Sequence, residues 1–199
     1  KYDHIAFDLK QEAEAFLLIE LDGNNLDTLI NESEKLNQVL ENNECIDVLF
    51  ADAAAQKEEL WRMRRIMAVS VKANSIYKEE DTVVPRAALP KLISGIKQIG
   101  TQYGFESVCY GHAGDGNLHI NIIKGAMSET DWHTKLKEGI IKIFELTVSL
   151  EGTLSGEHGI GLVQKEYMSI KYSPIHLDIM RGIKRVFDPN YILNPGKIF

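Results

Sequence analysis

A glycine-rich stretch beside a short apolar strand constrains this chain most, because it gathers several reactive side chains at one turn. It reads HAGDGNLHIN over residues 112–121. Strands predicted at residues 107–110 and 118–123 flank the glycines. A second cluster, SGEHG at residues 155–159, follows downstream. Together the two clusters contain histidines, amides and a carboxylate, a combination typical of an active site rather than of a packed core.

The remaining segments predict an α+β fold. Two more strands, at residues 14–21 and 45–50, and an extended segment at 77–85 are expected from their apolar residues. Few of these segments have the long Val/Ile runs of a buried parallel sheet, so we expect a mostly antiparallel sheet with helices packed on one face. Helical spacing and capping residues predict helices at 26–40, 53–72, after Pro85 up to Gly104, 128–150, and from Val163 and Pro174 onward.

The composition is that of a soluble globular protein and argues against a nucleic-acid surface. The chain has 199 residues and a net charge of −7, and its lysines and arginines form no stripe. Cys45 and Cys109 lie far apart in apolar segments, so we expect reduced thiols and a cytoplasmic location. No apolar run has the length of a membrane span, and no signal peptide opens the sequence. Because Lys1 is not an initiator Met, we expect a piece of a longer protein.

The glycines of the first cluster do not form a phosphate-binding loop. Gly111, Gly114 and Gly116 have the order G-x-x-G-x-G, and a strand follows them. A dinucleotide-binding loop has the order G-x-G-x-x-G and needs a helix N-terminus after it. The glycines are better explained by positive φ angles or by close approach of the backbone to a ligand. A tight connection between strands remains the alternative.

The histidines indicate metal or proton chemistry. His119 and Asn121 share one face of a strand, and the loop can bring His112 back towards them. Together with Glu157, the two histidines would provide the imidazole and carboxylate ligands of a catalytic metal site. His158 would then be a general base. From the residue types alone, two structural alternatives remain. The strand histidines could simply form hydrogen bonds, and Glu157 and His158 could be a solvated pair in a loop.

Two cationic residues are candidates for binding an acidic substrate. Arg64 follows Trp61 in a predicted helix, and a guanidinium group binds a carboxylate well. Lys78 lies in the charged run Lys78–Asp81. For both residues, a solvated surface position is the alternative.

Long motifs, in order, resemble the C-terminal half of FAD-linked 2-hydroxy-acid oxidases and dehydrogenases. They are LWRMR, DTVVP, HAGDGNLHIN, EGTLSGEHGIG and FDPNYILNPGKIF. The family includes the glycolate oxidase D-subunit, D-lactate dehydrogenase and D-2-hydroxyglutarate dehydrogenase. The resemblance covers residues 14–199. It implies a ferredoxin-like cap domain of the vanillyl-alcohol-oxidase type over residues 1–199, with an N-terminal FAD-binding domain outside this chain.

The resemblance also implies roles for individual residues. By position in the motifs, His112, His119 and Glu157 match a zinc-like metal triad, and His158 matches the base. Substrate contacts are implied for Arg64, for Asn121 and, less securely, for Lys78, because this chain reads YKEED where hydroxyglutarate enzymes read KYD. The tail residues Asn194 and Lys197 match a segment that returns to the flavin domain.

The implied reaction is oxidation of a small D-2-hydroxy acid, such as glycolate or D-lactate, to the 2-oxo acid. Its cofactor is FAD, bound mainly by the N-terminal domain of the same polypeptide, so the isolated chain is expected to be inactive. The electron acceptor, peripheral membrane association of the full enzyme and homodimer formation are left open. Two alternatives remain, a free-standing metal-dependent hydrolase and a non-catalytic module that binds small acids.

Overall fold

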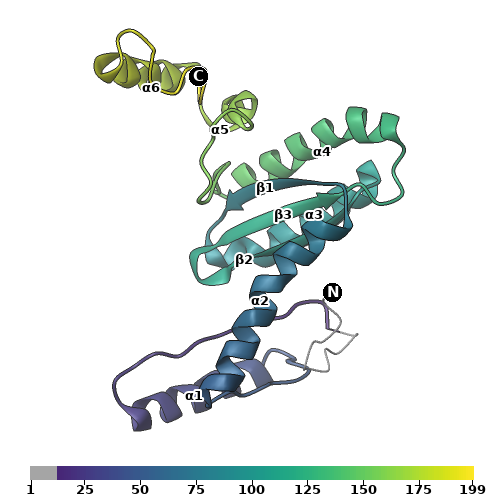
Figure 1. Ribbon diagram of the computed structural model, residues 1–199, viewed down its shortest axis with the longest axis vertical. Helices are drawn as coiled ribbons and strands as arrows, with labels where there is room; N and C mark the ends of the chain where they lie inside the picture. Colours follow the sequence, from purple (N-terminus) through teal and green to yellow (C-terminus); the bar gives the residue numbers. More distant parts are fainter. Residues whose placement is uncertain (1–12) are drawn as a thin grey trace. The chain divides into compact units, whose positions relative to one another are not determined.

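The computed structural model describes residues 13–199 and divides the chain into two compact units, Lys1–Ser70 and Val71–Phe199. Helix α2 (Ala54–Asn74) begins in the first unit and ends in the second. The second unit contains the β-sheet, drawn in blue to teal in Figure 1. Among the candidate functional residues, only Arg64 belongs to the first unit. The sheet and the histidine clusters are therefore parts of one unit.

Two helices of the first unit occur where the sequence predicts them. Helix α1 (Leu26–Glu41) begins at Asn25, whose side-chain oxygen accepts a hydrogen bond from the Thr28 N–H at 3.0 Å. This satisfies one of the N–H groups that the first turn of a helix leaves unpaired. Helix α2 corresponds to the helix predicted at residues 53–72.

The predicted strands at residues 14–21 and 45–50 are wrong for this structure. Within residues 13–199, neither segment pairs with a strand. Their apolar side chains are exposed, including Leu17 at 68% and Phe50 at 73%. A strand exists only through hydrogen bonds to a neighbouring strand, and an apolar segment does not identify that neighbour.

The second unit confirms the predicted α+β fold with an antiparallel sheet. Strands β1 (Tyr77–Val83), β2 (Glu106–His112) and β3 (Asn117–Ile123) lie in the order β1-β3-β2, and both pairings are antiparallel. The central strand β3 is buried along almost its whole length. Because side chains alternate along a strand, β3 presents different residues to each side of the sheet.

The hydrophobic core lies on one of those sides. Helices α3 (Leu89–Tyr103) and α4 (Glu129–Ser149) pack against the face that carries Leu118, Ile120 and Ile122. The side chains that fill this core without solvent exposure include Leu92, Ile96, Ile120, Ile122, Ile143 and Phe144. Ser128 caps α4 by accepting a hydrogen bond from the Asp131 N–H at 3.0 Å, as its sequence pattern predicts.

The chain after α4 passes along the edge of β1 before it forms short helices. Thr153 pairs with Val83 in an isolated antiparallel bridge. The helix predicted from Val163 is only a short turn of 3₁₀ helix and a single turn of α-helix. The helical segments not yet named are η1 (Arg86–Ala88), η2 (Ala113–Asp115), η3 (Lys165–Tyr167), α5 (Met168–Lys171) and α6 (Pro174–Phe187).

Among the described helices, none is both long and apolar enough to cross a membrane.

Candidate active site

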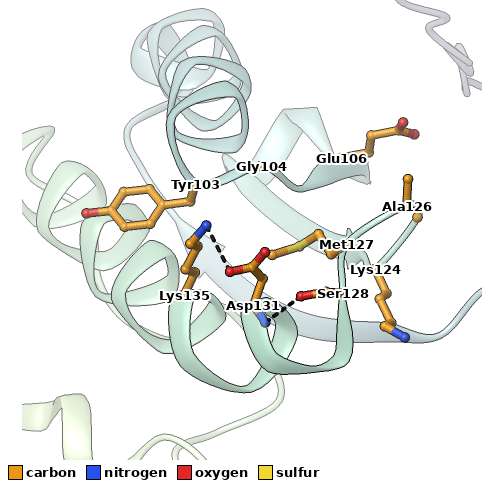
Figure 2. A pocket seen from close by; sticks show the side chains of 10 residues that line it. Tyr103, Gly104, Glu106, Lys124, Ala126, Met127, Ser128, Asp131 and Lys135 are labelled. Carbon is orange, nitrogen blue, oxygen red and sulfur yellow. Dashed lines mark hydrogen bonds and ion pairs between the residues drawn. The ribbon is translucent and has the colours of Figure 1, made fainter.

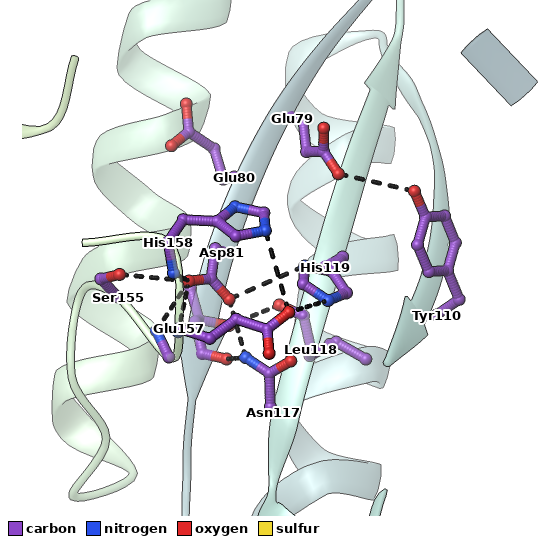
Figure 3. A network of polar contacts seen from close by, with 12 residues as sticks. Glu79, Glu80, Asp81, Tyr110, Asn117, Leu118, His119, Ser155, Glu157 and His158 are labelled. Atoms are coloured by element: carbon purple, nitrogen blue, oxygen red, sulfur yellow. Dashed lines mark hydrogen bonds and ion pairs between the residues drawn. The ribbon is translucent and has the colours of Figure 1, made fainter. Parts of the chain in front are cut away.

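The sheet face opposite the core helices carries the histidine cluster. His119 lies on β3, directly between Asp81 of β1 and Tyr110 of β2. Residues directly opposite each other in an antiparallel sheet have side chains on the same face. The rows on either side of this one are Glu79–Asn121–Val108 and Val83–Asn117–His112. A row of polar residues thus crosses all three strands at His119, as Figure 3 shows.

A glycine turn returns the chain from His112 to His119. The rings of the two histidines lie 6.3 Å apart in an edge-on arrangement. Gly116 has a φ of +73°, and a Cβ atom there would lie 1.9 Å from the Val84 carbonyl oxygen. The turn therefore needs glycine both for its backbone conformation and for its close approach to Val84.

The 155–158 loop reaches the same face from beyond α4. Its Glu157 side chain lies with Oε1 at 3.1 Å from His119 Nε2. The His158 ring stacks on the His119 ring with 4.9 Å between the ring centres. His158 Nε2 is 3.8 Å from Glu157 Oε1, beyond hydrogen-bond distance. The loop therefore brings a carboxylate and a second imidazole onto His119 from one side (Figure 3).

Asp81 holds this loop through its carboxylate. The group is 1% exposed, yet both of its oxygens accept hydrogen bonds. Oδ1 accepts from Asn117 Nδ2 at 2.7 Å. Oδ2 accepts four bonds from the loop, from Ser155 Oγ (3.1 Å), Gly156 N (2.9 Å), Glu157 N (2.8 Å) and His158 N (2.9 Å).

These hydrogen bonds keep Asp81 ionised. Burial alone would raise the pKa of its carboxyl, because a charge loses its hydration in the interior. The His158 and Glu157 N–H groups, with the side chains of Asn117 and Ser155, outweigh burial and leave the pKa below its ordinary value. A fixed negative charge therefore lies directly beneath the loop.

The environment of His119 favours its neutral form. Burial lowers the pKa of the imidazole, a shift that nearby His158 adds to and that Asp81 and Glu157 oppose. The Nδ1 atom has no hydrogen-bond partner among the described residues, and Asp81 Oδ1 lies 3.7 Å from it. A neutral imidazole is the form that binds metal ions.

Two overlapping groups could hold a metal ion on geometric grounds. Either His112, His119 and Glu157, or Asp81, His119 and His158, bring ligand atoms within 4.8 Å of one another. The oxygens of Asp81 are already occupied by donors from Asn117 and the loop. In the first group, no backbone N–H of the described residues donates to the Glu157 carboxylate, and the two nitrogens and one oxygen of the group suit a zinc-like ion. The residues present therefore fit a metal at His112, His119 and Glu157.

Asn121 has a buried amide without hydrogen-bond partners among the described residues and lies two residues after His119 on β3. Its side chain is fully buried, and neither its oxygen nor its nitrogen has a hydrogen-bond partner within the part of the chain that the structure describes. A buried amide without partners costs free energy. Asn121 shares the face of His119 on β3, so a polar group bound there would lie near both side chains.

The remaining predicted site residues are the cations Lys78 and Arg64 and the tail residues Asn194 and Lys197. Lys78 lies on the opposite face of β1, where its Nζ atom is 3.0 Å from Oε1 of the buried Glu80. Arg64 is half-buried on α2, in the first unit. In the tail, Lys197 Nζ donates to Asn194 Oδ1 at 2.9 Å. The structure thus brings together the predicted histidines, Glu157 and Asn121, but not Lys78.

A surface cavity of about 250 Å³ lies at the other end of the sheet. It is bordered by Glu106, at the start of β2, and by Lys124, just after β3 (Figure 2). The Asp131 carboxylate in its wall lies 2.9 Å from Lys135 Nζ, and the Asp131 N–H donates to the capping Ser128 hydroxyl. None of the residues that line this cavity belongs to the histidine cluster, and its Asp131 side chain is already paired.

Two residues of the cluster, Asp81 and Asn117, were not predicted as site residues from the sequence. Asp81 belongs to the charged run Lys78–Asp81, in which only Lys78 was considered as a site residue, but the structure buries both Glu80 and Asp81. The signal lies in the position of the run, because it precedes Val83 and Val84 in a segment predicted to be extended. Acidic residues in such a segment must find donors if the strand becomes buried.

The chain matches the family described as FAD linked oxidases, C-terminal domain, over residues 2–198. It is 36% identical to a D-lactate dehydrogenase of Anaerostipes hadrus, over 94% of this chain and 40% of that protein. It is 31% identical to the glycolate oxidase subunit GlcD of Bacillus subtilis, over 99% of this chain and 42% of that protein. A D-2-hydroxyglutarate dehydrogenase of Stutzerimonas stutzeri is 36% identical over 77% of this chain and 34% of its own length.

These matches confirm the resemblance inferred from the motifs. The chain spans less than half the length of each of these three relatives. The match to the family extends over nearly the whole of this chain, residues 2–198. The chain belongs to the FAD-linked oxidase family, as its C-terminal domain.

Proposed function

We propose that this chain is the substrate-binding and catalytic half of a flavin-dependent oxidoreductase that converts a small D-2-hydroxy acid to its 2-oxo acid. One observation carries the proposal: His112, His119, Glu157 and His158 converge on one face of the sheet. The relatives named as D-lactate dehydrogenase and glycolate oxidase support a substrate of the glycolate or D-lactate type.

Different residues of this face would bind the metal ion and accept the proton. His112, His119 and Glu157 would hold a divalent, zinc-like ion. When bound, the ion supplies Lewis acidity toward the α-hydroxyl group and FAD supplies the hydride acceptor. His158 takes the hydroxyl proton at Nε2, which faces Glu157 at 3.8 Å without a hydrogen bond.

Binding of the acid needs further polar groups. Asn121 donates from its buried amide to the substrate, which would relieve its lack of partners. Arg64 binds the substrate carboxylate in the assembled enzyme, because a guanidinium group forms paired hydrogen bonds with a carboxylate. Lys78 is less well supported as a substrate contact, because it pairs with Glu80 on the other face of β1.

The other half of the enzyme is a FAD-binding domain in the same polypeptide. The share of each relative that this chain leaves uncovered supports that proposal. Asn194 and Lys197, at the exposed tail, contact that domain or its cofactor in the assembled protein. The isolated chain is accordingly expected to be inactive.

The full-length protein tests this proposal with a panel of acids. Glycolate, D-lactate, L-lactate and D-2-hydroxyglutarate are supplied with an artificial electron acceptor, before and after treatment with a chelator. We expect oxidation of a D-acid or glycolate in preference to L-lactate, and loss of that activity on metal removal. Hydrolysis of esters or amides without oxidation of any acid would instead support the metal-dependent hydrolase.

A further inference from the structure

The hydrogen bonds of Asp81 determine where the backbone of the 155–158 loop lies. Three consecutive N–H groups, at Gly156, Glu157 and His158, point at the same oxygen with distances of 2.8–2.9 Å. Consecutive N–H groups that converge in this way form a concave site for an anion. Here the anion is a side chain of the chain itself, so the loop is wrapped around a fixed point of β1.

Fixing those N–H groups also fixes two side chains of the site. Glu157 and His158 each leave the backbone from a residue whose N–H is bound to Asp81. Glu157 then reaches His119 Nε2, and His158 stacks on the ring of His119. Without the anchor, an exposed loop with two glycines on either side of this pair would have many other conformations.

Ser155 strengthens the same arrangement from within the loop. Its hydroxyl donates to Asp81 Oδ2 at 3.1 Å, and its oxygen accepts from the Gly159 N–H at 2.7 Å. The loop is thus closed on both sides of Glu157 and His158. Hydrogen bonds to an ionised group are roughly twice as strong as those between neutral groups.

The neighbouring Glu80 offers a matched comparison. It is as buried as Asp81, at 1% exposure, but it lies on the core face of β1. Its Oε2 atom accepts from Gln164 Nε2 at 3.0 Å, and Lys78 contacts Oε1. Removing its charge disturbs the same strand without breaking a hydrogen bond to the 155–158 loop.

We propose that Asp81 is a positioning residue, which orients Glu157 as a metal ligand and His158 as the base through their backbone N–H groups. The inference rests on the proposed function, because it assigns Asp81 a part in the same site. Asp81 itself touches neither substrate nor cofactor. Its effect should therefore appear in metal affinity and in turnover, beyond any effect on folding.

The test compares Asp81→Ala, Asp81→Asn and Glu80→Gln in the full-length protein. Zn²⁺ affinity is measured on the resting protein by competition with a chelating dye, and kcat is measured at saturating Zn²⁺ and substrate. Thermal unfolding reports stability for each variant. Loss of an outer-shell partner costs about 10–100-fold in metal affinity or activity.

We expect Asp81→Ala to bind Zn²⁺ about 10–100-fold more weakly and to lose kcat by a similar factor. Asp81→Asn keeps an acceptor of the same shape and should recover part of both losses, even if Asp81→Ala folds poorly. Glu80→Gln should lower stability but leave Zn²⁺ affinity and kcat close to wild type. The inference is overturned if Asp81→Ala, or Asp81→Asn when only that variant folds, matches Glu80→Gln in both measurements.

The design separates this inference from the proposed function. A wild-type protein that oxidises no hydroxy acid would refute the proposed function, whatever Asp81 does to Zn²⁺ binding. A wild-type protein that turns over but binds no Zn²⁺ would refute the metal site alone, and the kcat comparison would then still test the orientation of His158. If the wild-type protein binds Zn²⁺ and oxidises a hydroxy acid, and the Asp81 variants keep its Zn²⁺ affinity and kcat, only the inference about Asp81 is refuted.

Discussion

At the scale of single residues, Gly156 allows the 155–158 loop to lie against β1 and β3. A Cβ atom at this position would lie 1.9 Å from Asn117 Nδ2 and 3.0 Å from Asp81 Oδ1. Both atoms belong to buried, hydrogen-bonded side chains that cannot move without losing their partners. The loop can therefore come this close only because residue 156 has no side chain.

Gly156→Ala should displace the loop while leaving the core intact. The added methyl group must push away either Asn117 or the loop backbone, so Glu157 would move off His119. We expect metal affinity and turnover to fall at least about tenfold, on the scale of other supporting residues of metal sites, with a smaller change in unfolding temperature. Gly114→Ala is the control, since a Cβ atom there meets nothing within 4 Å. Equal behaviour of the two variants would contradict this account.

At the scale of elements, Asp188 ties the C-terminal tail to helix α6. The residue is 4% exposed and caps the end of the helix. Its carboxylate accepts from the Ile192 N–H at 2.9 Å and the Leu193 N–H at 3.0 Å. Lys184 Nζ, one turn earlier, lies 2.8 Å from Oδ2. Asp188 therefore organises the turn that begins the tail motif.

The tail should loosen in acid. Chiefly the Lys184 ion pair lowers the pKa of Asp188, against the effect of burial and with help from the Ile192 and Leu193 N–H groups. The folded tail therefore binds fewer protons than the unfolded tail. The stabilisation is fully present above the unfolded pKa, about 4, and is lost as the pH falls through the lower folded value.

Hydrogen exchange of the Ile192 and Leu193 amides in the full-length protein measures this effect. After correction for intrinsic exchange rates, their protection should be constant above about pH 5 and should decline below about pH 4. Asp188→Asn should show weaker protection at neutral pH and little further decline. Protection of the wild-type amides that persists unchanged to pH 3 would show that the carboxylate does not hold the tail.

Most of the long helices and the three strands of the sheet were predictable from the sequence because their signals are local. Asn25 and Ser128 cap α1 and α4 as their patterns indicate, and β3 shows the predicted alternation around His119. The burial of Asp81 was not predictable in this way. It depends on the register between β1 and β3 and on a loop more than 70 residues further along the chain. Pairing partners over such separations are set by tertiary packing.

At the scale of the whole molecule, we propose that this chain carries one part of an active site. Side chains that can bind a metal ion lie together on one face of the sheet, and the chain covers 34–42% of the length of the three relatives described. The central claim is that a hydroxy acid is oxidised on this face once the FAD-binding part is present. His158 is the residue whose loss should affect the chemical step most selectively.

The most direct test is the rate of flavin reduction in a single anaerobic turnover of the full-length protein. Wild type, His158→Asn and the control His133→Asn, whose side chain is 75% exposed on α4, are each mixed with the acid that the wild-type enzyme oxidises best. Loss of a general base typically costs 10²–10⁴-fold in rate, so we predict that roughly this loss occurs in His158→Asn and that His133→Asn reduces its flavin at the wild-type rate. Flavin reduction at the wild-type rate in His158→Asn would contradict the account.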